Sequence, residues 1–424
     1  MPFSLLSDSP ATRDLLDFDR YAQPLLEILE SDTIVTPLTI GIFGTWGSGK
    51  STLLGILSDK LEKDEQKRFV CVKFNPWVHR KEANLLIPLL HALRDTLALD
   101  PQQRFKASAE KILDVLVRLG ADLVLKHFTG GVVSLDKLEK YEKAYLERRA
   151  QAESQLRNLR KSLEDEAKAL HKAKARLIFF IDDLDRCDPE EIIDLLESIK
   201  LFLDIENVVH VLAVDKEIID RGVQVKYGKF EFAKTGRESL IGAEYLEKMI
   251  QVPVHLFPLH PTQVTGYIKA LDQSQDVQKQ MALLAAALSP NPRKIKRLLN
   301  AIAFTNYILN SDPKHYGNLD RSVATALGVI RVEEPGLYLE VSRMPNLLVA
   351  MEEAYANQRN PKNINDFMDF QEKAEAARAI CETYYRPASF LAGIFQTVKF
   401  SSAAKTAGKN GPSLADYISV LGGF

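Results

Sequence analysis

The sequence predicts an α/β fold built on a buried parallel sheet, and three observations favour it. Residues 38–43 and 176–181 are apolar runs of strand length, rich in β-branched and aromatic side chains, as strands buried on both faces are. A glycine-rich segment, residues 44–51, follows the first run and leads into a helical pattern. Carboxylates follow the second run, at the end of a strand where ligands of open α/β sheets bind.

The glycine-rich segment, called here the phosphate loop, fits the pattern G-x-x-x-x-G-K-[ST]. Such a loop turns backbone N–H groups toward a phosphate chain, and the N-terminus of the following helix adds partial positive charge. We expect Lys50 to reach the β- and γ-phosphates and the Ser51 hydroxyl to hold Mg²⁺. The residues expected to bind nucleotide are Gly44, Thr45, Trp46, Gly47, Ser48, Gly49, Lys50, Ser51 and Thr52.

The carboxylates after residues 176–181 have distinct expected roles. Asp182 is expected to hold Mg²⁺, directly or through water, and Asp183 to orient or deprotonate the attacking water. Asp185 is a second candidate for the water, and Arg186 for phosphate charge. A salt-bridged loop is the alternative for both residues.

Three further apolar runs predict strands, at residues 69–74, 208–214 and 251–256, and Pro253 restricts the last one to a sheet edge or a strand terminus. Asp215 follows the second of these runs. We expect it to support the phosphate site from a distance, with simple loop capping as the alternative. Arg186 and Arg221 are candidates for an arginine finger supplied to a neighbouring copy.

Helical patterns surround these strands. Residues 14–30 predict a lead-in helix, and residues 82–99 predict another helix. The charged span 136–174 has apolar residues at 3/4 spacing, which predicts a helical hairpin arm or a short coiled coil for partners or self-association. A solvated surface helix is the alternative. The apolar positions are Leu156, Leu159, Leu163, Ala167 and Leu170.

From residue 262 onward the pattern is helical. Pro292 follows Asn291 at the first turn of one predicted helix. Arg293, Lys296, Arg297 and Asn300 then lie on one face at positions i, i+3, i+4 and i+7. We expect this face to act as a lid over a triphosphate, with a solvated basic stripe as the alternative. Residues 401–412, rich in Ser, Ala, Gly and Lys, are expected to be flexible.

Composition excludes several classes of protein. The 424 residues include 55 basic and 57 acidic side chains, so the whole chain has no nucleic-acid footprint. Three scattered cysteines fit neither a disulfide framework nor a zinc site and favour a reducing cytoplasm. No signal peptide is seen, and no apolar stretch reaches the roughly 18 residues of a membrane span. The nearest such stretch, residues 112–135, is charged and predicts an amphipathic helix.

Five ordered motifs resemble the KAP family of P-loop NTPases. They are residues 44–51 with Trp46 inside the loop, Phe74-Asn75-Pro76-Trp77, residues 181–187, residues 245–251 and residues 291–297. The resemblance implies a three-layer P-loop NTPase core of the ASCE division, related to the STAND and AAA+ groups, with a helical lid. It also implies that Lys50, Ser51, Asp182 and Asp183 serve nucleotide and Mg²⁺, and that Arg293 matches the lid arginine. Phage exclusion in bacteria and signalling scaffolds are settings of this family. Many members carry transmembrane helices in the insert, which is charged here.

The expected organisation is therefore an α/β core with a helical insert, a helical lid and a helical C-terminal region. The expected segments are 1–100 and 176–260 for the two halves of the core, 101–175 for the insert, 261–315 for the lid and 316–424 for the C-terminal region.

The expected activity is Mg²⁺-dependent binding and slow hydrolysis of ATP, which controls conformation or assembly in bacterial anti-phage defence. ATP is preferred to GTP because no Asn-Lys-x-Asp signature is present. Expected partners are copies of the chain or another protein, contacted through the insert or the C-terminal region. The alternatives are a nucleotide-binding scaffold with little hydrolysis, a nucleic-acid-stimulated ATPase and a membrane-bound scaffold.

Overall fold

The computed structural model of the chain divides it into two compact units. We call residues 10–257 the core unit, and residues 258–424 with residues 1–9 the helical unit. The structure describes residues 5–8, 14–82, 84–100, 104–121, 157–227, 245–356, 379–380, 383–384, 390–402 and 412–421. Residues 403–411, which make up most of the segment expected to be flexible, lie outside these ranges. Leu156, the first apolar position of the insert pattern, also lies outside them.

A five-stranded parallel sheet forms the middle of the core unit. Its strands are β1 (Leu38–Phe43), β2 (Phe69–Phe74), β3 (Arg176–Ile181), β4 (Val208–Val214) and β5 (Val252–His255), in the order β2-β3-β4-β1-β5. All seven residues of β4 are buried, as expected for a central strand of a parallel sheet. Pro253 lies on the edge strand β5, where it pairs with Gly41 in register. The predicted α/β fold with a parallel sheet is confirmed.

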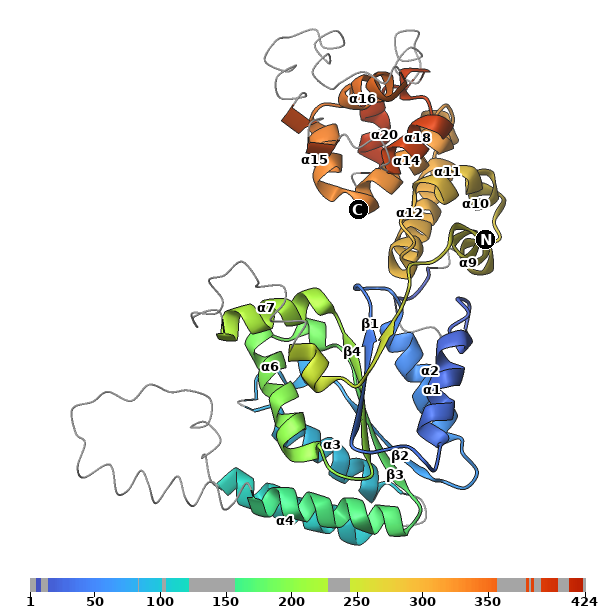
Figure 1. The fold of residues 1–424 in the computed structure, drawn as a ribbon. Helices are drawn as coiled ribbons and strands as arrows, with labels where there is room; N and C mark the ends of the chain where they lie inside the picture. The colour runs from blue at the N-terminus through green and yellow to red at the C-terminus, as the bar shows by residue number, and fades with distance from the viewer. Residues whose placement is uncertain are drawn as a thin grey trace, which may run out of the picture. The chain divides into compact units, whose positions relative to one another are not determined.

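Helices cover both faces of this sheet, with α1 and α2 on one side and α6 and α7 on the other (Figure 1). The described helices of the unit are α1 (Asp19–Glu30), α2 (Lys50–Glu62), α3 (Leu86–Ala98), α4 (Lys106–Ala121), α6 (Pro189–Ser198) and α7 (Lys216–Tyr227), with two further helices over residues 157–172 and 245–249. Short helical turns are η1 (Pro76–His79), η3 (Leu184–Arg186) and η4 (Ile199–Leu203).

Two predicted helices begin later than expected. The helix expected from Asp14 begins at Asp19, because the Asp14 carboxylate accepts hydrogen bonds from the backbone N–H groups of Leu16 and Asp19 and forms a turn instead. The helix expected from Glu82 begins at Leu86, whose N–H is bound by the side chain of Asn84.

The apolar stripe of the insert packs inside the core unit. Leu159, Leu163, Ala167 and Leu170 on the helix over residues 157–172 belong to the same buried cluster as the strands. Lys111 of α4 pairs with the nearly buried Glu166 at 2.6 Å, which fixes the two helices side by side. The interpretation of this stripe as an association arm is therefore wrong for the described residues, because its apolar face is already covered.

The helical unit contains the labelled helices that follow residue 258 in the chain. They are α9 (Pro261–Leu271), α10 (Gln275–Lys279), α11 (Met281–Ala287), α12 (Pro292–Ser311), α13 (Pro313–Tyr316), α14 (Arg321–Glu333), α15 (Pro335–Arg343), α16 (Leu347–Ala356), α18 (Phe390–Thr397) and α20 (Leu414–Leu421). Asn291 caps α12 by accepting hydrogen bonds from the N–H groups of Arg293 and Lys294, and Pro292 occupies the first turn.

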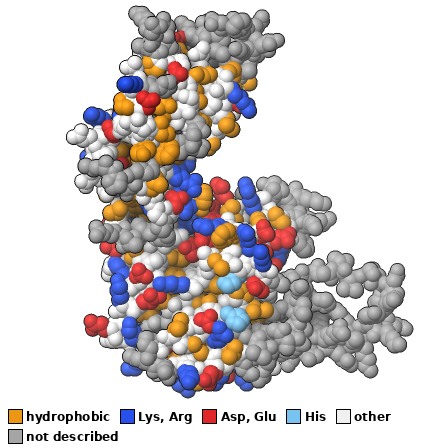
Figure 2. Space-filling model, turned by 180° about the vertical axis from the view of Figure 1, so that it is seen from behind, with side chains coloured by type: hydrophobic (Ala, Val, Ile, Leu, Met, Phe, Trp, Pro, Cys, Tyr) orange, Lys and Arg blue, Asp and Glu red, His pale blue; other side chains and the backbone are white. Residues whose placement is uncertain are grey.

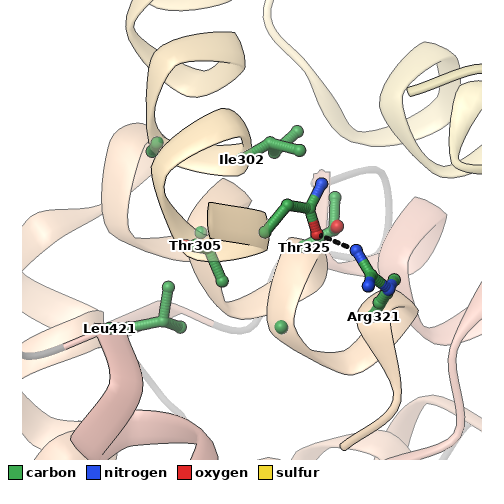
Figure 3. Close-up of a pocket in the computed structure, with 9 residues that line it drawn as sticks. Ile302, Thr305, Arg321, Thr325 and Leu421 are labelled. Carbon is green, nitrogen blue, oxygen red and sulfur yellow. Dashed lines mark hydrogen bonds between the residues drawn. The ribbon is translucent and has the colours of Figure 1, made fainter. Parts of the chain in front are cut away.

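A small cavity lies between α12, α14 and α20 (Figure 3). Its volume is about 10 Å³, which suits a single water molecule rather than a nucleotide. Arg321 at its rim donates to Asn306 at 2.7 Å and to Asn310 at 2.7 Å, so it fastens α14 to α12. The cavity therefore belongs to the packing of the helices. Among the described helices, none combines the length and the apolar composition that crossing a bilayer requires.

Candidate nucleotide site

The phosphate loop connects the end of β1 to the start of α2. Gly47 and Gly49 have φ values of 84° and 104°, a left-handed backbone that favours glycine. A Cβ atom on Gly49 would lie 2.3 Å from the ring of Phe18, which packs directly against the loop. The lead-in segment before α1 thus supports the loop, a role that its sequence did not indicate. Gly49 is the N-cap of α2, so the helix N-terminus points its N–H groups at the loop.

Lys50 is buried, with 7% of its side chain exposed. Its Nζ atom donates to the carbonyl oxygens of Gly44 at 2.8 Å and Thr45 at 3.2 Å, and lies 3.6 Å from Asp185 Oδ2. The ammonium group is therefore held inside the loop by two carbonyls and a carboxylate. A triphosphate is a stronger partner for the same charge, because it offers several anionic oxygens.

Ser51 and Asp182, the two residues expected to hold Mg²⁺, are neighbours. Burial raises the pKa of Asp182, and this is opposed by hydrogen bonds from the Ser51 side chain and from the N–H of Asp183, the latter at 2.8 Å. A hydroxyl and a carboxylate side by side supply the oxygen ligands that Mg²⁺ prefers alongside phosphate oxygens. The Ser48 hydroxyl is buried with no hydrogen-bond partner among the described residues. This donor set fits a magnesium nucleotide.

Both carboxylate oxygens of Asp183 are engaged. Asn75 Nδ2 donates to Asp183 Oδ2 at 2.7 Å, and Arg186 Nε lies 2.9 Å from Asp183 Oδ1. The backbone of Asp183 is left-handed, with φ of 56°. The guanidinium groups of Arg80 and Arg186 lie over the ring of Trp77, 5.2 and 5.4 Å from its centroid. Asp183 is thus fixed by a polar cluster at the adjoining ends of β2 and β3.

The salt-bridged alternative therefore describes Asp185 and Arg186 in this structure, since each pairs with a neighbouring charged side chain of the site. Asn75 was not among the expected site residues. The signal that could have found it is its position directly after β2, which pairs with β3 along its length.

The other residues proposed from the sequence for this site are Asp215, Arg221 and Arg293. Asp215 accepts a hydrogen bond from Glu217 N–H at 3.2 Å, which is the capping alternative. Burial raises the pKa of Asp215 and the charge of Lys50 lowers it, so the two residues also share one electrostatic environment. Arg221 is exposed on α7. Arg293 belongs to the helical unit, at the first turn of α12.

The described cysteines take no part in this chemistry. Burial raises the pKa of Cys71 to about 12, and burial followed by nearby carboxylates raises the pKa of Cys187 to about 12. Thiols with such pKa values are poor nucleophiles at neutral pH. Cys381 lies outside the described residues.

Comparison with known proteins places the chain in a family. Residues 18–309 match the KAP family P-loop domain. An uncharacterised protein of Methanocaldococcus jannaschii is 28% identical over 182 residues, which covers 34% of this chain and 89% of that protein. The phage T7 exclusion protein of Escherichia coli K12 is 24% identical over 366 residues, which covers 76% of this chain and 45% of that protein.

Among solved structures, the Aeropyrum pernix ORC1 protein in complex with DNA has a TM-score of 0.37 and 13% identity, over 98% of this chain and 94% of that chain. So distant a similarity carries no argument about function. The family match spans well over half of the chain and contains the phosphate loop, the acidic strand end and the start of α12. The chain therefore belongs to the KAP family of P-loop proteins.

Proposed function

We propose that this protein binds ATP with Mg²⁺ in the phosphate loop and hydrolyses it slowly to ADP and phosphate. Membership of the KAP family supports nucleotide binding in general. The observation that carries the finer proposal is that Lys50, Ser51 and Asp182 lie together where the loop meets the C-terminal ends of β1 and β3. An ammonium, a hydroxyl and a carboxylate at this place are the groups that phosphoryl transfer requires.

Each residue has a proposed role. Lys50 leaves its loop carbonyls and Asp185 to bind the β- and γ-phosphates. Ser51 and Asp182 hold Mg²⁺, which neutralises charge on the phosphate oxygens. Asp183 orients the attacking water. Asn75 and Arg186 each contact one of its oxygens, and each oxygen keeps a second lone pair that can accept a hydrogen bond from water.

The same contacts support a role as a nucleotide-controlled switch. A ligand shifts a conformational equilibrium only through differential contacts with the two states. Here the nucleotide replaces contacts that Lys50 makes with the loop and Asp185. We further propose that Arg293 of α12 acts as the lid arginine, the role implied by its match to that position of the family. The resulting change alters assembly or partner affinity.

The setting we propose is bacterial anti-phage defence. The support is one relative, the phage T7 exclusion protein, which shares 24% identity with this chain. This chain spans 45% of that protein's length, so the rest of that protein has no counterpart in the comparison. A plaque assay with phage-challenged cells expressing the wild-type chain or Lys50→Ala tests this part.

Phosphate release from Mg²⁺-ATP tests the enzymatic proposal. Lys50→Ala is expected to abolish binding, and Asp183→Asn to preserve binding and reduce turnover by roughly 100-fold or more. Matched controls are Lys63→Ala on the exposed end of α2 and Glu190→Gln on the exposed start of α6, which are expected to retain wild-type turnover. Normal turnover in Lys50→Ala and Asp183→Asn would refute the proposal. The same assay with GTP tests nucleotide preference.

A second candidate is a nucleotide-binding scaffold with little hydrolysis. The contacts that Asp183 makes with Asn75 and Arg186 give this carboxylate a structural role, which a scaffold without hydrolysis also needs. Tight binding of ATP without phosphate release from the wild-type protein would establish this alternative. A nucleic-acid-stimulated ATPase has less support, since Lys and Arg side chains are interspersed with Asp and Glu on the face drawn in Figure 2. Added DNA or RNA that accelerates turnover would revive it.

A further inference from the structure

Two aromatic residues of the core unit meet beside the phosphate loop. Tyr21 lies in the first turn of α1, and Phe257 follows the edge strand β5 by two residues. The hydroxyl of Tyr21 accepts a hydrogen bond from the backbone N–H of Phe257 at 3.2 Å. The start of α1 is thus joined to the chain that leaves β5. The roles proposed above for nucleotide and Mg²⁺ use neither residue.

The residues that precede this aromatic pair contact the loop at its two ends. Leu256 comes directly before Phe257, and its Cβ atom lies 3.5 Å from the position of a Cβ atom on Gly44, the first residue of the loop. Phe18 packs on the last glycine of the loop, and its carbonyl accepts the N–H of Tyr21 at 2.9 Å. The position of the pair relative to the loop is therefore fixed from both sides.

The order of the strands separates the aromatic pair from the carboxylates of the site. β4 and β3 lie on one side of β1, and β5 lies on the other. Because all the strands are parallel, their C-terminal ends share one edge of the sheet. Asp182 follows β3 at this edge, and Phe257 follows β5. A nucleotide that lies along the loop with its Mg²⁺ at Asp182 has its sugar and base at the other end, toward β5.

Phe257 presents an open ring, and Tyr21 does not. The side chain of Phe257 is 71% exposed, although its backbone is held by the Tyr21 hydroxyl. The guanidinium group of Arg20 lies over the Tyr21 ring, 4.7 Å from its centroid, and donates to the Tyr21 hydroxyl at 3.1 Å. An exposed phenylalanine ring gains free energy when a flat apolar surface covers it. The face of a nucleotide base is such a surface.

We propose that Phe257 stacks on the base of the bound nucleotide, and that Tyr21 is a positioning residue that holds Phe257 in place through its hydroxyl. This rests on the proposed function, because it takes the triphosphate to lie in the phosphate loop. A ring that stacks covers more of a purine than of a pyrimidine, and it reads no hydrogen-bonding edge. The ligands it selects are therefore purine nucleoside triphosphates, with adenine and guanine alike.

Titration calorimetry of the full chain with Mg²⁺ tests this with three ligands: a non-hydrolysable ATP analogue, the corresponding CTP analogue and inorganic triphosphate. Phe257→Ala is expected to weaken binding of the ATP analogue about 10-fold, to weaken binding of the CTP analogue less, and to leave inorganic triphosphate unchanged. Phe257→Tyr keeps an aromatic ring and is expected to bind all three as wild type does. The matched control is Val35→Ala, a side chain 83% exposed before the opposite end of β1, and it is expected to change nothing.

The positioning role of Tyr21 has a separate readout. Tyr21→Phe removes the hydroxyl and keeps the ring, and it is expected to weaken the ATP analogue about two- to five-fold without affecting inorganic triphosphate. Because Tyr21 acts through Phe257, adding Tyr21→Phe to Phe257→Ala is expected to cause no further loss. Independent, additive losses would overturn this role.

Two results would overturn the stacking inference and leave the phosphate site intact. One is an unchanged affinity of Phe257→Ala for the ATP analogue. The other is an equal loss for every ligand that the wild type binds, since a ring that only supports the loop would affect all of them alike. A wild-type protein that binds neither the ATP analogue nor inorganic triphosphate would instead refute the proposed function, and this inference with it.

Discussion

At the scale of single residues, Asp182 shows how the site opposes the stability of the fold. Burial raises the pKa of this carboxyl, so the folded protein disfavours its charged form.

We expect Asp182→Asn to raise the melting temperature of the nucleotide-free protein by roughly 2–4 °C, which corresponds to about 1 kcal/mol of stability. The same variant is expected to lose the further stabilisation by Mg²⁺-ATP, about 2.7 kcal/mol in wild type at 100 times the dissociation constant. Thermal unfolding with and without Mg²⁺-ATP measures both. A variant that is less stable without ligand, yet equally stabilised by it, would contradict this reasoning.

His210 makes a second residue-scale prediction. It lies at the centre of β4, stacked on Phe179 with ring centroids 5.5 Å apart, and neither ring nitrogen has a hydrogen-bond partner within the described residues. Burial lowers its pKa to about 4, with a smaller opposing effect of Asp204 and a lowering effect of Lys200.

Between the ordinary pKa of histidine, about 6.5, and a pKa of about 4, the unfolded chain binds this proton and the folded chain does not. Stability is therefore lost as the pH falls through this window, by about 3 kcal/mol in total. Denaturant unfolding between pH 7 and pH 4 is expected to show a shallower loss for His210→Phe than for wild type. The exposed His171→Gln should keep the wild-type slope.

The site residues that the sequence identified are those that share a short motif. Lys50 and Ser51 are adjacent in the chain, and Asp182 ends a strand whose apolar run is continuous, so local pattern was enough to find them. Asn75 was missed because its role depends on β2 lying beside β3, more than 100 residues later in the chain.

At the scale of elements, the helix over residues 157–172 shows that apolar periodicity predicts a helix but does not predict which residues pack on its apolar face. The 3/4 spacing of Leu159, Leu163, Ala167 and Leu170 predicted a helix with one apolar face, and the helix is present. Periodicity does not say what covers that face. In the structure the strands and α4 cover it, so the residues stabilise the core unit.

A pair of leucines tests this assignment. Leu163 is 4% exposed, and Leu113 on α4 is 41% exposed. Leu163→Ala is expected to lower the free energy of unfolding by about 2–4 kcal/mol, because it leaves a cavity in a packed core. Leu113→Ala is expected to change it by less than about 0.5 kcal/mol. Urea unfolding followed by circular dichroism measures both. An association defect in Leu163→Ala with unchanged stability would restore the partner-arm interpretation.

Strands were predicted more accurately than helix ends, for a physical reason. The strands of a parallel sheet are buried on both faces, and their apolar runs have clear limits, as in β1 and β3. Helix starts depend on which side chain caps the first N–H groups. Asp14 captures two of them in a turn, so α1 begins at Asp19 although the apolar pattern extends further back.

At the scale of the whole molecule, the proposed residues divide between two compact units. The phosphate loop and its carboxylates lie in the core unit, and Arg293 lies in the helical unit. A nucleotide that replaces the contacts of Lys50 favours whichever state of the protein allows its own contacts, by the difference in binding free energy. The largest consequence expected of such a bias is a change in assembly, because surfaces exposed in one arrangement are altered in the other.

Mass measurement in solution tests this expectation most directly. With Mg²⁺ and a non-hydrolysable ATP analogue, light scattering coupled to size exclusion is expected to report a mass above the 47.7 kDa of one chain. Lys50→Ala, which cannot bind the phosphates, is expected to stay at the mass of the nucleotide-free protein, and Lys63→Ala to behave as wild type. An unchanged mass at saturating analogue would contradict nucleotide-controlled assembly and would leave only a conformational change within one chain. Small-angle scattering would then show whether nucleotide alters the dimensions of that chain.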